Sequence, residues 1–231
     1  MSESMEGQLV LVTGASRGIG AATARKMQEA GARLVRIARS DMPLLPGSFD
    51  IRADLADSAS RQAALAQVSD QAGVPDVVVS NAGAFLLAPL GDTSDSLVRE
   101  QIGINVEAPI AVARHFLPSM RERGSGVHVI VGSIADWRGF AGNAAYAASK
   151  YAIRGLHDVL LEEYRGTGVR CTLISPGPTD TAVWDPLDPD RRPDLPNRAD
   201  MLTPDDVAGA IWFAATRPPH VQVELIRLGR A

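Results

Sequence analysis

An α/β fold built on one doubly wound parallel sheet of about seven strands is predicted by three observations. Short runs rich in Val, Ile and Leu alternate along the chain with longer stretches that have a helical pattern. The runs are apolar at consecutive positions, which is typical of parallel strands that helices cover on both faces. The first run is followed by a glycine-rich turn that opens a helix, an arrangement common at the start of such sheets.

The elements can be assigned in chain order. Strands are expected at 9–13, 33–38, 49–53, 76–80, 127–132, 169–175 and 221–228. Helices are expected at 18–30, 57–72, 95–123, 146–165 and 204–216. The sequence shows neither internal repeats nor the composition of a second domain, so residues 1–231 are expected to form a single domain.

One segment breaks the alternation. Residues 182–202 contain four prolines and five aspartates, a composition that cannot continue a helix or a strand. The segment directly follows a strand that ends in PGP, and ligands of open α/β sheets bind outside the carboxyl ends of the strands. We therefore expect a substrate lid, because an exposed Trp184 would be costly in water; the alternative is a surface loop without function.

Composition and charge disfavour several classes of partner. The net charge of -4 and the pI near 5.6 give no electrostatic reason to expect nucleic acid or anionic lipid. The first residues lack a secretory signal pattern and no apolar run reaches roughly 18 residues, so a cytoplasmic protein without a membrane segment is expected. Cys171 reads as a buried strand residue, and the four histidines show no metal-binding spacing, so no metal site is expected.

The turn TGASRGIG, residues 13–20, has the features of a nucleotide-binding loop. Gly14 allows a sharp turn, Gly18 lets the backbone approach a phosphate, and Gly20 permits close packing of the helix on the strand. The helix N-terminus supplies N–H donors that have no partner within the helix. The strand–turn–helix context makes nucleotide binding the leading interpretation.

The end of the second strand indicates which nicotinamide coenzyme is used. An enzyme for NAD(H) usually places a carboxylate there to bind the ribose hydroxyls, but this strand ends in Ala38 and Arg39. A guanidinium is suited to bind a phosphate in a bidentate manner, and Arg17 in the glycine turn adds a second cation. NADP(H) is therefore predicted over NAD(H); the alternative is that both arginines are solvated surface groups.

Tyr146 and Lys150 lie four residues apart in AAYAASK, so in a helix they share one face. A free tyrosine has a pKa of about 10, and a neighbouring ammonium favours the phenolate and lowers this pKa toward the working range. The chain has 21 arginines and two lysines, Lys26 and Lys150, which favours a specific role for Lys150 over a plain surface cation. Ser133 ends the strand thirteen residues before Tyr146 and can hydrogen-bond a substrate carbonyl.

In series, these motifs resemble those of the short-chain dehydrogenase/reductase family, of its single-domain, Rossmann-like type. The resemblance runs from about residue 8 to 181 and also rests on Asp54 after the third strand, NAG at 81–83 and PGPTDT at 176–181. It implies a catalytic set of Asn105, Ser133, Tyr146 and Lys150, in which Asn105 helps a water connect Lys150 to solvent. The cofactor-binding residues that it implies are Gly14, Ser16, Arg17, Gly18, Ile19, Gly20, Arg39, Asp54, Leu55, Asn81, Ala82, Gly83, Tyr146, Lys150, Pro176, Gly177, Thr179 and Thr181. For NAG a strand-ending turn, and for Asp54 a helix N-cap region, remain structural alternatives.

The predicted function is that of an NADP(H)-dependent oxidoreductase. Hydride would move between the nicotinamide and a carbonyl or secondary alcohol carbon of a small molecule, with Tyr146 as general acid/base. A serine hydrolase is a distant second, because no GxSxG motif surrounds Ser133. A non-catalytic NADP-sensing or scaffold protein is the other alternative, although it would have no need of Ser133, Tyr146 and Lys150 together.

Substrate contacts are expected from Ser133, Ala135, Trp137 and Trp184, with Phe85 and Leu86 nearby. These residues suggest a partly apolar carbonyl or alcohol. The resemblance also implies a homodimer or homotetramer. The C-terminus departs from the family pattern, because the chain ends in VQVELIRLGRA without the Asp-Gly-Gly turn of many relatives.

Overall fold

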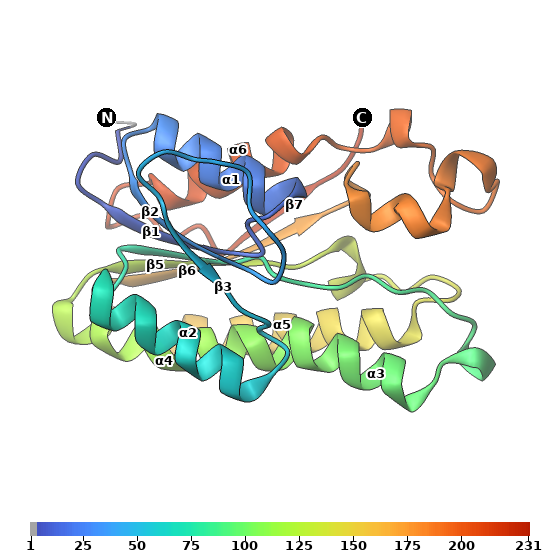
Figure 1. Cartoon of the computed structure of the whole chain (residues 1–231), viewed down its shortest axis with the longest axis horizontal. Coiled ribbons are helices and arrows are strands. Elements are labelled where there is room, and N and C mark those ends of the chain that lie inside the picture. Colours follow the sequence, from blue (N-terminus) through green and yellow to red (C-terminus); the bar gives the residue numbers. More distant parts are fainter. Residues whose placement is uncertain (1–3) are drawn as a thin grey trace.

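The computed structural model describes residues 4–231 and contains one seven-stranded parallel sheet (Figure 1). The strand order is β3-β2-β1-β4-β5-β6-β7, and every neighbouring pair is parallel. Because the order reverses between β1 and β4, the connections leave on opposite sides there and a crevice forms at the carboxyl ends of the strands. The predicted doubly wound α/β fold is confirmed. The strands are β1 (Leu9–Thr13), β2 (Arg33–Ala38), β3 (Phe49–Arg52), β4 (Val77–Ser80), β5 (Gly126–Val131), β6 (Val169–Pro176) and β7 (Leu225–Leu228).

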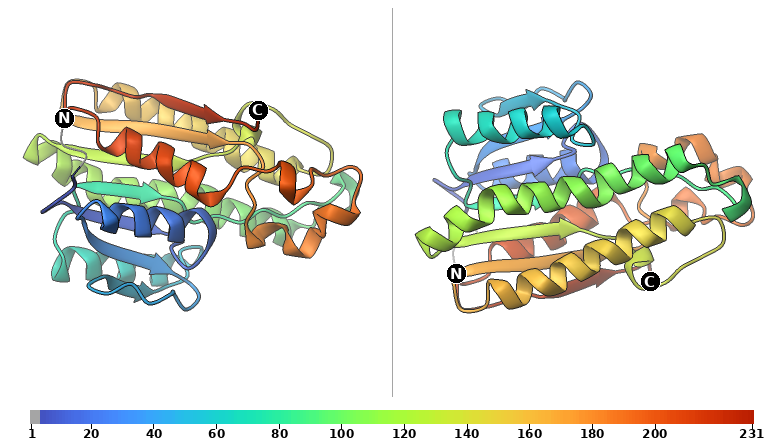
Figure 2. Two further views of the ribbon diagram at one scale, coloured as in Figure 1. Left: turned by 90° about the horizontal axis from the view of Figure 1, so that it is seen from above. Right: turned by 90° about the horizontal axis from the view of Figure 1, so that it is seen from below.

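Helices cover both faces of the sheet. Figures 1 and 2 show α1 (Gly18–Glu29) and α6 (Pro204–Ala215) side by side on one face, and α2 (Ser58–Gln71), α4 (Ala108–Arg123) and α5 (Ala144–Glu163) on the other. Successive strand residues point to opposite faces, so Leu9 and Leu11 join the core beneath α4 and α5, whereas Val10 and Val12 join the core beneath α1 and α6. Two apolar layers therefore fix the sheet from both sides.

The helix predicted at 95–123 is divided in the structure. It consists of α3 (Asp95–Ile102), a π-helical turn η2 (Gly103–Glu107) and α4. Pro109 has no N–H and cannot donate the α-helical hydrogen bond to the carbonyl of Asn105, which gives a local reason for the irregular turn. Asn105 thus lies in a widened turn between two regular helices.

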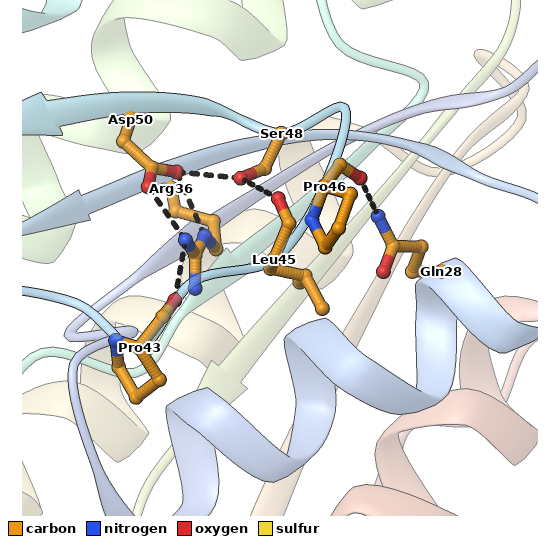
Figure 3. Close-up of polar contacts among 7 residues, drawn as sticks. All are labelled: Gln28, Arg36, Pro43, Leu45, Pro46, Ser48 and Asp50. Atoms are coloured by element: carbon orange, nitrogen blue, oxygen red, sulfur yellow. Dashed lines mark hydrogen bonds and ion pairs between the residues drawn. The ribbon is translucent and has the colours of Figure 1, made fainter.

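The connection between β2 and β3, residues 39–48, contains no helix and is held by polar contacts (Figure 3). Arg36 on β2 is only 2% exposed, and its guanidinium pairs with the Asp50 carboxylate at 2.5 Å and donates to the Pro43 carbonyl at 2.9 Å. From α1, the Gln28 amide donates to the Pro46 carbonyl at 2.5 Å. The connection is shorter than the dozen or more residues usual between parallel strands. Besides the polar contacts, Met42 and Leu45 pack against the core beneath α1 and α6.

Two expectations for the C-terminal third need correction. Residues 182–202 contain short 3₁₀ helices, η4 (Ala182–Leu187), η5 (Pro189–Arg191) and η6 (Arg198–Asp200), because a single 3₁₀ turn needs too few residues for the prolines to prevent it. The last strand begins at Leu225, not at residue 221. The side chain of Gln222 makes hydrogen bonds to both backbone groups of Cys171, so it occupies the place of a strand neighbour.

Candidate active site

The ends of β1 and β4 are joined by Thr13. Its hydroxyl accepts hydrogen bonds from the N–H groups of Asn81 at 3.0 Å and Ala82 at 3.1 Å, and donates to the Val79 carbonyl at 3.3 Å. The Asn81 amide in turn donates to the carbonyls of Thr13 and Gly14. NAG therefore follows directly on the end of β4, and the same contacts hold it against the glycine turn at the crevice.

Two glycines of the turn are required by close approach. Gly14 has a φ of +68°, and a Cβ there would lie 2.8 Å from the Cα of Ala82. A Cβ on Gly20 would overlap the Gly14 carbonyl oxygen. The turn is thus packed as tightly as the sequence predicted, and it leaves the N-terminus of α1 facing the crevice.

A cleft of about 290 Å³ opens at this crevice. Most of the predicted cofactor-binding residues line it: Gly14, Ser16, Arg17, Gly18, Ile19, Arg39, Asp54, Leu55, Asn81, Ala82, Gly83, Tyr146, Lys150 and Thr181. Gly20 lies beneath the turn, and Pro176, Gly177 and Thr179 line an adjoining pocket instead. Sequence reasoning missed the cleft residues Ser40 and Glu100, which no motif marks.

The end of β2 places Arg39 at the cleft. Its guanidinium lies 3.8 Å from the Asp54 carboxylate; the Arg39 side chain is largely exposed and that of Asp54 is half-buried. The Arg52 guanidinium donates to the Arg39 carbonyl at 3.1 Å, which fixes the backbone of that residue. Asp57 fills the N-cap position of α2, so Asp54 lies before the cap, with its carboxylate accepting from the N–H of Ala56 at 2.9 Å.

The predicted catalytic group lies where the cleft meets the adjoining pocket: Tyr146 and Lys150 line the cleft, and Ser133 lines the pocket with Tyr146. Ser133 follows β5, and Tyr146 and Lys150 lie one turn apart on α5. The Lys150 ammonium is buried, donates to the Val131 carbonyl at 3.1 Å and lies 5.7 Å from the centroid of the Tyr146 ring. The two residues thus share one helix face, as their spacing predicted.

The pKa of Tyr146 shifts in the direction opposite to the sequence prediction. Burial raises it to about 12, a hydrogen bond with Ser133 lowers it in part, and the charge of Asp136 raises it further. Burial also lowers the pKa of Lys150 to about 8, against an opposing effect of Asp136. The prediction counted the cation beside the phenol but not the removal of both groups from water.

The side chain of Asn105 makes three hydrogen bonds within the protein. Its amide donates to the Ala84 carbonyl at 2.9 Å and to the Ser149 hydroxyl at 3.0 Å, and accepts from the Ala84 N–H at 2.9 Å. One turn earlier, the buried Gln101 makes the same pair of hydrogen bonds to Leu86, at 3.3 and 3.4 Å. Asn105 and Gln101 thus clamp the backbone at Ala84 and Leu86. Their spacing of four residues was the sequence signal that could have revealed this clamp. The water relay through Asn105 stays a prediction.

A second pocket, of about 130 Å³, adjoins Tyr146. Phe85 and Trp184 line it as expected, and the Phe85 ring meets those of Tyr146 and Trp184 edge to face, with centroids 4.8 and 4.9 Å apart. Sequence reasoning missed other apolar lining residues, namely Ile134, Phe140 and Val183.

Three expected substrate residues lie elsewhere. Trp137 is 41% exposed and stacks against the Arg227 guanidinium at 4.8 Å, because the 3₁₀ turn after Ser133 directs it outward. Ala135 is buried, and its N–H donates to the Ser133 hydroxyl at 3.2 Å. The backbone N–H and carbonyl of Leu86 are hydrogen-bonded to the Gln101 side chain. None of the three lines the pocket.

Asp136 is a charged group at the site that the sequence reasoning did not consider. It is fully buried, and its Oδ2 accepts hydrogen bonds from the Ser133 N–H at 3.3 Å and from the Ser175 hydroxyl. Its Oδ1 is buried with no hydrogen-bond partner. The carboxylate therefore fixes the backbone of Ser133 and acts electrostatically on Tyr146 and Lys150.

The predicted lid segment covers part of both cavities. Val183 lines the cleft and the pocket, and the buried Trp184 donates from its indole N–H to the Thr179 carbonyl at 3.0 Å. Arg198 pairs with Asp180 at 2.5 Å and with Asp185 at 2.6 Å, and so ties the far end of the segment to its start. Closure of this segment over substrate stays a prediction.

Two broader properties complete the description. None of the helices between residues 4 and 231 combines the length and hydropathy needed to span a bilayer. In the same part of the chain, no three His, Cys, Asp or Glu side chains are grouped in a way that could hold a metal ion.

A doubly wound sheet with a glycine turn, a cleft at its switch point and a Ser-Tyr-Lys group beside it defines a dinucleotide-dependent oxidoreductase fold. The family model for short chain dehydrogenases matches residues 8–192. The chain is an oxidoreductase that belongs to the short-chain dehydrogenase family.

Relatives and solved structures agree with this assignment. The ketoacyl reductase HetN of Nostoc sp. is 31% identical over 218 residues, which cover 90% of this chain and 75% of the relative. An uncharacterized oxidoreductase of Staphylococcus epidermidis is 30% identical over 96% of each chain. A putative NAD(P)-dependent gluconate 5-dehydrogenase from Beutenbergia cavernae, solved with bound NADP, is 30% identical with a TM-score of 0.86 and covers 98% of this chain and 97% of its own. Serine dehydrogenase from Escherichia coli is 27% identical with a TM-score of 0.81 over 95% of this chain and 96% of its own.

Proposed function

We propose that this protein is an NADP(H)-dependent reductase or dehydrogenase that transfers hydride between the nicotinamide and the carbonyl or secondary alcohol carbon of a small molecule. One observation carries the proposal: Tyr146 lines both the 290 Å³ cleft and the 130 Å³ pocket. A nucleotide in the cleft and a substrate in the pocket would therefore meet at the phenol, beside Ser133 and Lys150.

The residues of the cleft fit the coenzyme. Gly14 and Gly20 leave a turn without side chains at the N-terminus of α1, which suits the pyrophosphate. Arg39 and Arg17 both line the cleft, and two guanidinium groups suited to bind a phosphate support NADP(H) over NAD(H). Several similar structures contain NADP, including a metagenomic short-chain oxidoreductase that is 29% identical. When bound, the nicotinamide would supply or accept the hydride.

Proton transfer to the substrate oxygen would involve Tyr146, Ser133 and Lys150. In carbonyl reduction, the carbon gains the hydride, the C=O electron pair moves to oxygen, and that oxygen takes the phenolic proton of Tyr146. Ser133 would hydrogen-bond the developing alkoxide, and the Lys150 ammonium would stabilise the phenolate that remains. A pKa of about 12 means that the phenol holds its proton at neutral pH, which suits an acid in the reducing direction.

A carbonyl screen would test this function. Purified protein is mixed with NADPH or NADH and a panel of ketones and aldehydes, and loss of nicotinamide absorbance is measured. We expect NADPH-dependent turnover of at least one carbonyl, and turnover slower by about 10²–10⁴ with Tyr146→Phe. Tight NADPH binding without turnover of any carbonyl or alcohol would favour the NADP-sensing or scaffold alternative.

Assembly and location are further parts of the proposal. A homodimer or homotetramer is expected by family resemblance, and a cytoplasmic location from a sequence in which no apolar run reaches roughly 18 residues. Size-exclusion chromatography with light scattering would measure the first, and fractionation of cells the second.

A further inference from the structure

The pocket beside Tyr146 has an uncharged lining. Its described lining residues include no Asp, Glu, Lys, Arg or His. They are Ile19, Phe85, Val131, Gly132, Ser133, Ile134, Phe140, Tyr146, Pro176, Gly177, Pro178, Thr179, Thr181, Val183 and Trp184. A ligand with a charged group would find no side chain of opposite charge in this pocket.

Most polar groups of this lining are already paired within the protein. The Trp184 indole N–H donates to the Thr179 carbonyl at 3.0 Å, and the Thr179 hydroxyl donates to the Gly177 carbonyl at 3.0 Å. The Gly177 N–H donates to the Leu228 carbonyl at 2.8 Å, and Pro176 and Pro178 have no N–H. The remaining side-chain hydroxyls of the lining are those of Ser133, Tyr146 and Thr181. They are uncharged groups that can hydrogen-bond a carbonyl oxygen.

From this lining we propose that the enzyme selects uncharged, mainly apolar ketones or the corresponding secondary alcohols, and rejects substrates that place a carboxylate in the pocket. The inference rests on the proposed function and narrows its substrate class. Moving a carboxylate from water into an apolar site is costly unless an opposite charge or several donors receive it. An alkyl group instead gains free energy by leaving water.

Phe85 forms one wall of this pocket. Its ring contacts both Tyr146 and Trp184 edge to face, so it closes the pocket between the reacting phenol and the lid segment. The backbone on either side of Phe85 is clamped, at Ala84 by Asn105 and at Leu86 by Gln101. Gln101, which is fully buried, is thereby a positioning residue for the wall.

A matched pair of probes tests the substrate class. One is a methyl alkyl ketone, and the other is the keto acid in which the far methyl group of that ketone is replaced by a carboxylate. We expect kcat/KM with NADPH to favour the ketone by roughly tenfold or more, since an unpaired buried charge costs at least that much. Equal use of the two probes, or preference for the keto acid, would overturn the inference and leave the proposed function standing. NADPH binding without reduction of any carbonyl would overturn both.

A pair of variants makes the test independent of substrate reactivity. Phe140 at the pocket and Phe213 on α6 are equally exposed, at 42% and 43%. Phe140→Arg supplies a cation at the pocket, so the preference for the ketone should fall by roughly tenfold. Phe213→Arg should leave the preference unchanged. A preference that Phe140→Arg does not alter, in a variant with normal unfolding temperature and NADPH affinity, would contradict the inference.

The clamp is tested by Gln101→Leu, which keeps the volume but removes both hydrogen bonds to Leu86. We expect the KM for the ketone to rise several-fold and the ketone preference to shrink, while kcat and NADPH affinity change little. Gln62→Leu on the exposed face of α2 serves as the control. Equal losses in NADPH affinity and kcat would indicate a merely structural role and would count against positioning of the wall.

Discussion

The Arg39 guanidinium lies 3.8 Å from the Asp54 carboxylate at the mouth of the cleft, with 73% and 41% of these side chains exposed. An exposed pair at this separation contributes little free energy, so Arg39 can turn toward a phosphate at small cost. This arrangement makes the coenzyme preference testable at a single residue.

Arg39→Ala should raise the KM for NADPH by roughly tenfold or more, because a hydrogen bond to a charged group contributes about 1.5–3 kcal/mol. The KM for NADH should change little. Steady-state kinetics with both coenzymes measure this, and Arg33→Ala at the opposite end of β2 is the control. Equal effects on both coenzymes would show that Arg39 does not read the 2′-phosphate.

Tyr146→Phe should lower kcat by about 10²–10⁴, the usual contribution of a positioned proton donor. The phenyl ring keeps its contact with Phe85, so NADPH affinity and the unfolding temperature should stay close to those of the unsubstituted protein. Fluorescence titration with NADPH measures the affinity. Activity within a few-fold of normal would rule out Tyr146 as the acid.

The charge of Asp136 should shift the alkaline limit of activity. Burial lowers the pKa of Lys150 to about 8 and raises that of Tyr146, and the Asp136 carboxylate raises both pKa values. Carbonyl reduction needs both groups protonated, so its rate should fall as the pH rises through that range. Asp136→Asn should move the falling limb of the kcat profile to lower pH, and Glu163→Gln on the exposed end of α5 should not. An unmoved limb would exclude this electrostatic role.

The protein should lose stability in acid because of two buried histidines. Burial lowers the pKa of His128 to about 3 and also lowers that of His157, although Asp158 and Glu224 oppose the second shift. Below pH 6.5 the unfolded chain binds more protons, so His128 alone should reduce the free energy of unfolding by up to about 1.4 kcal/mol per pH unit. Urea unfolding between about pH 8 and about pH 5, a range that includes the ordinary histidine pKa, measures the slope. His128→Gln should flatten it, and an unchanged slope would assign the loss to other groups.

Arg198 should hold the segment 182–202 over the pocket. Its two ion pairs join Asp180 and Asp185, whereas Arg192 in the same segment pairs with Asp194 two residues away. Because salt screens exposed ion pairs, the substrate KM of the unsubstituted protein should rise with salt concentration. Arg198→Ala should raise this KM several-fold and make it independent of salt. Arg192→Ala is the matched control. Identical kinetics for both variants would argue against a lid.

The sequence predicted the sheet, its helices and the convergence of Ser133, Tyr146 and Lys150, because strand ends and helical spacing follow from local patterns. It did not predict the outward position of Trp137, which depends on a 3₁₀ turn capped by Ser133 and Asp136. The sequence also did not predict that the pKa of Tyr146 is raised, because the cause is burial, which arises only when the chain packs. Gln101 and Asp136 acquire their roles only when distant segments meet.

The short connection between β2 and β3 has a practical consequence for engineering. It contributes no helix to either layer, and Arg36 and Asp50 anchor it from within the strands, beside the position of Arg39. Residues 39–48 thus form a compact cassette. Exchanging that cassette offers a route to a new coenzyme choice, with apolar residues kept at Met42 and Leu45, which pack against the core beneath α1 and α6.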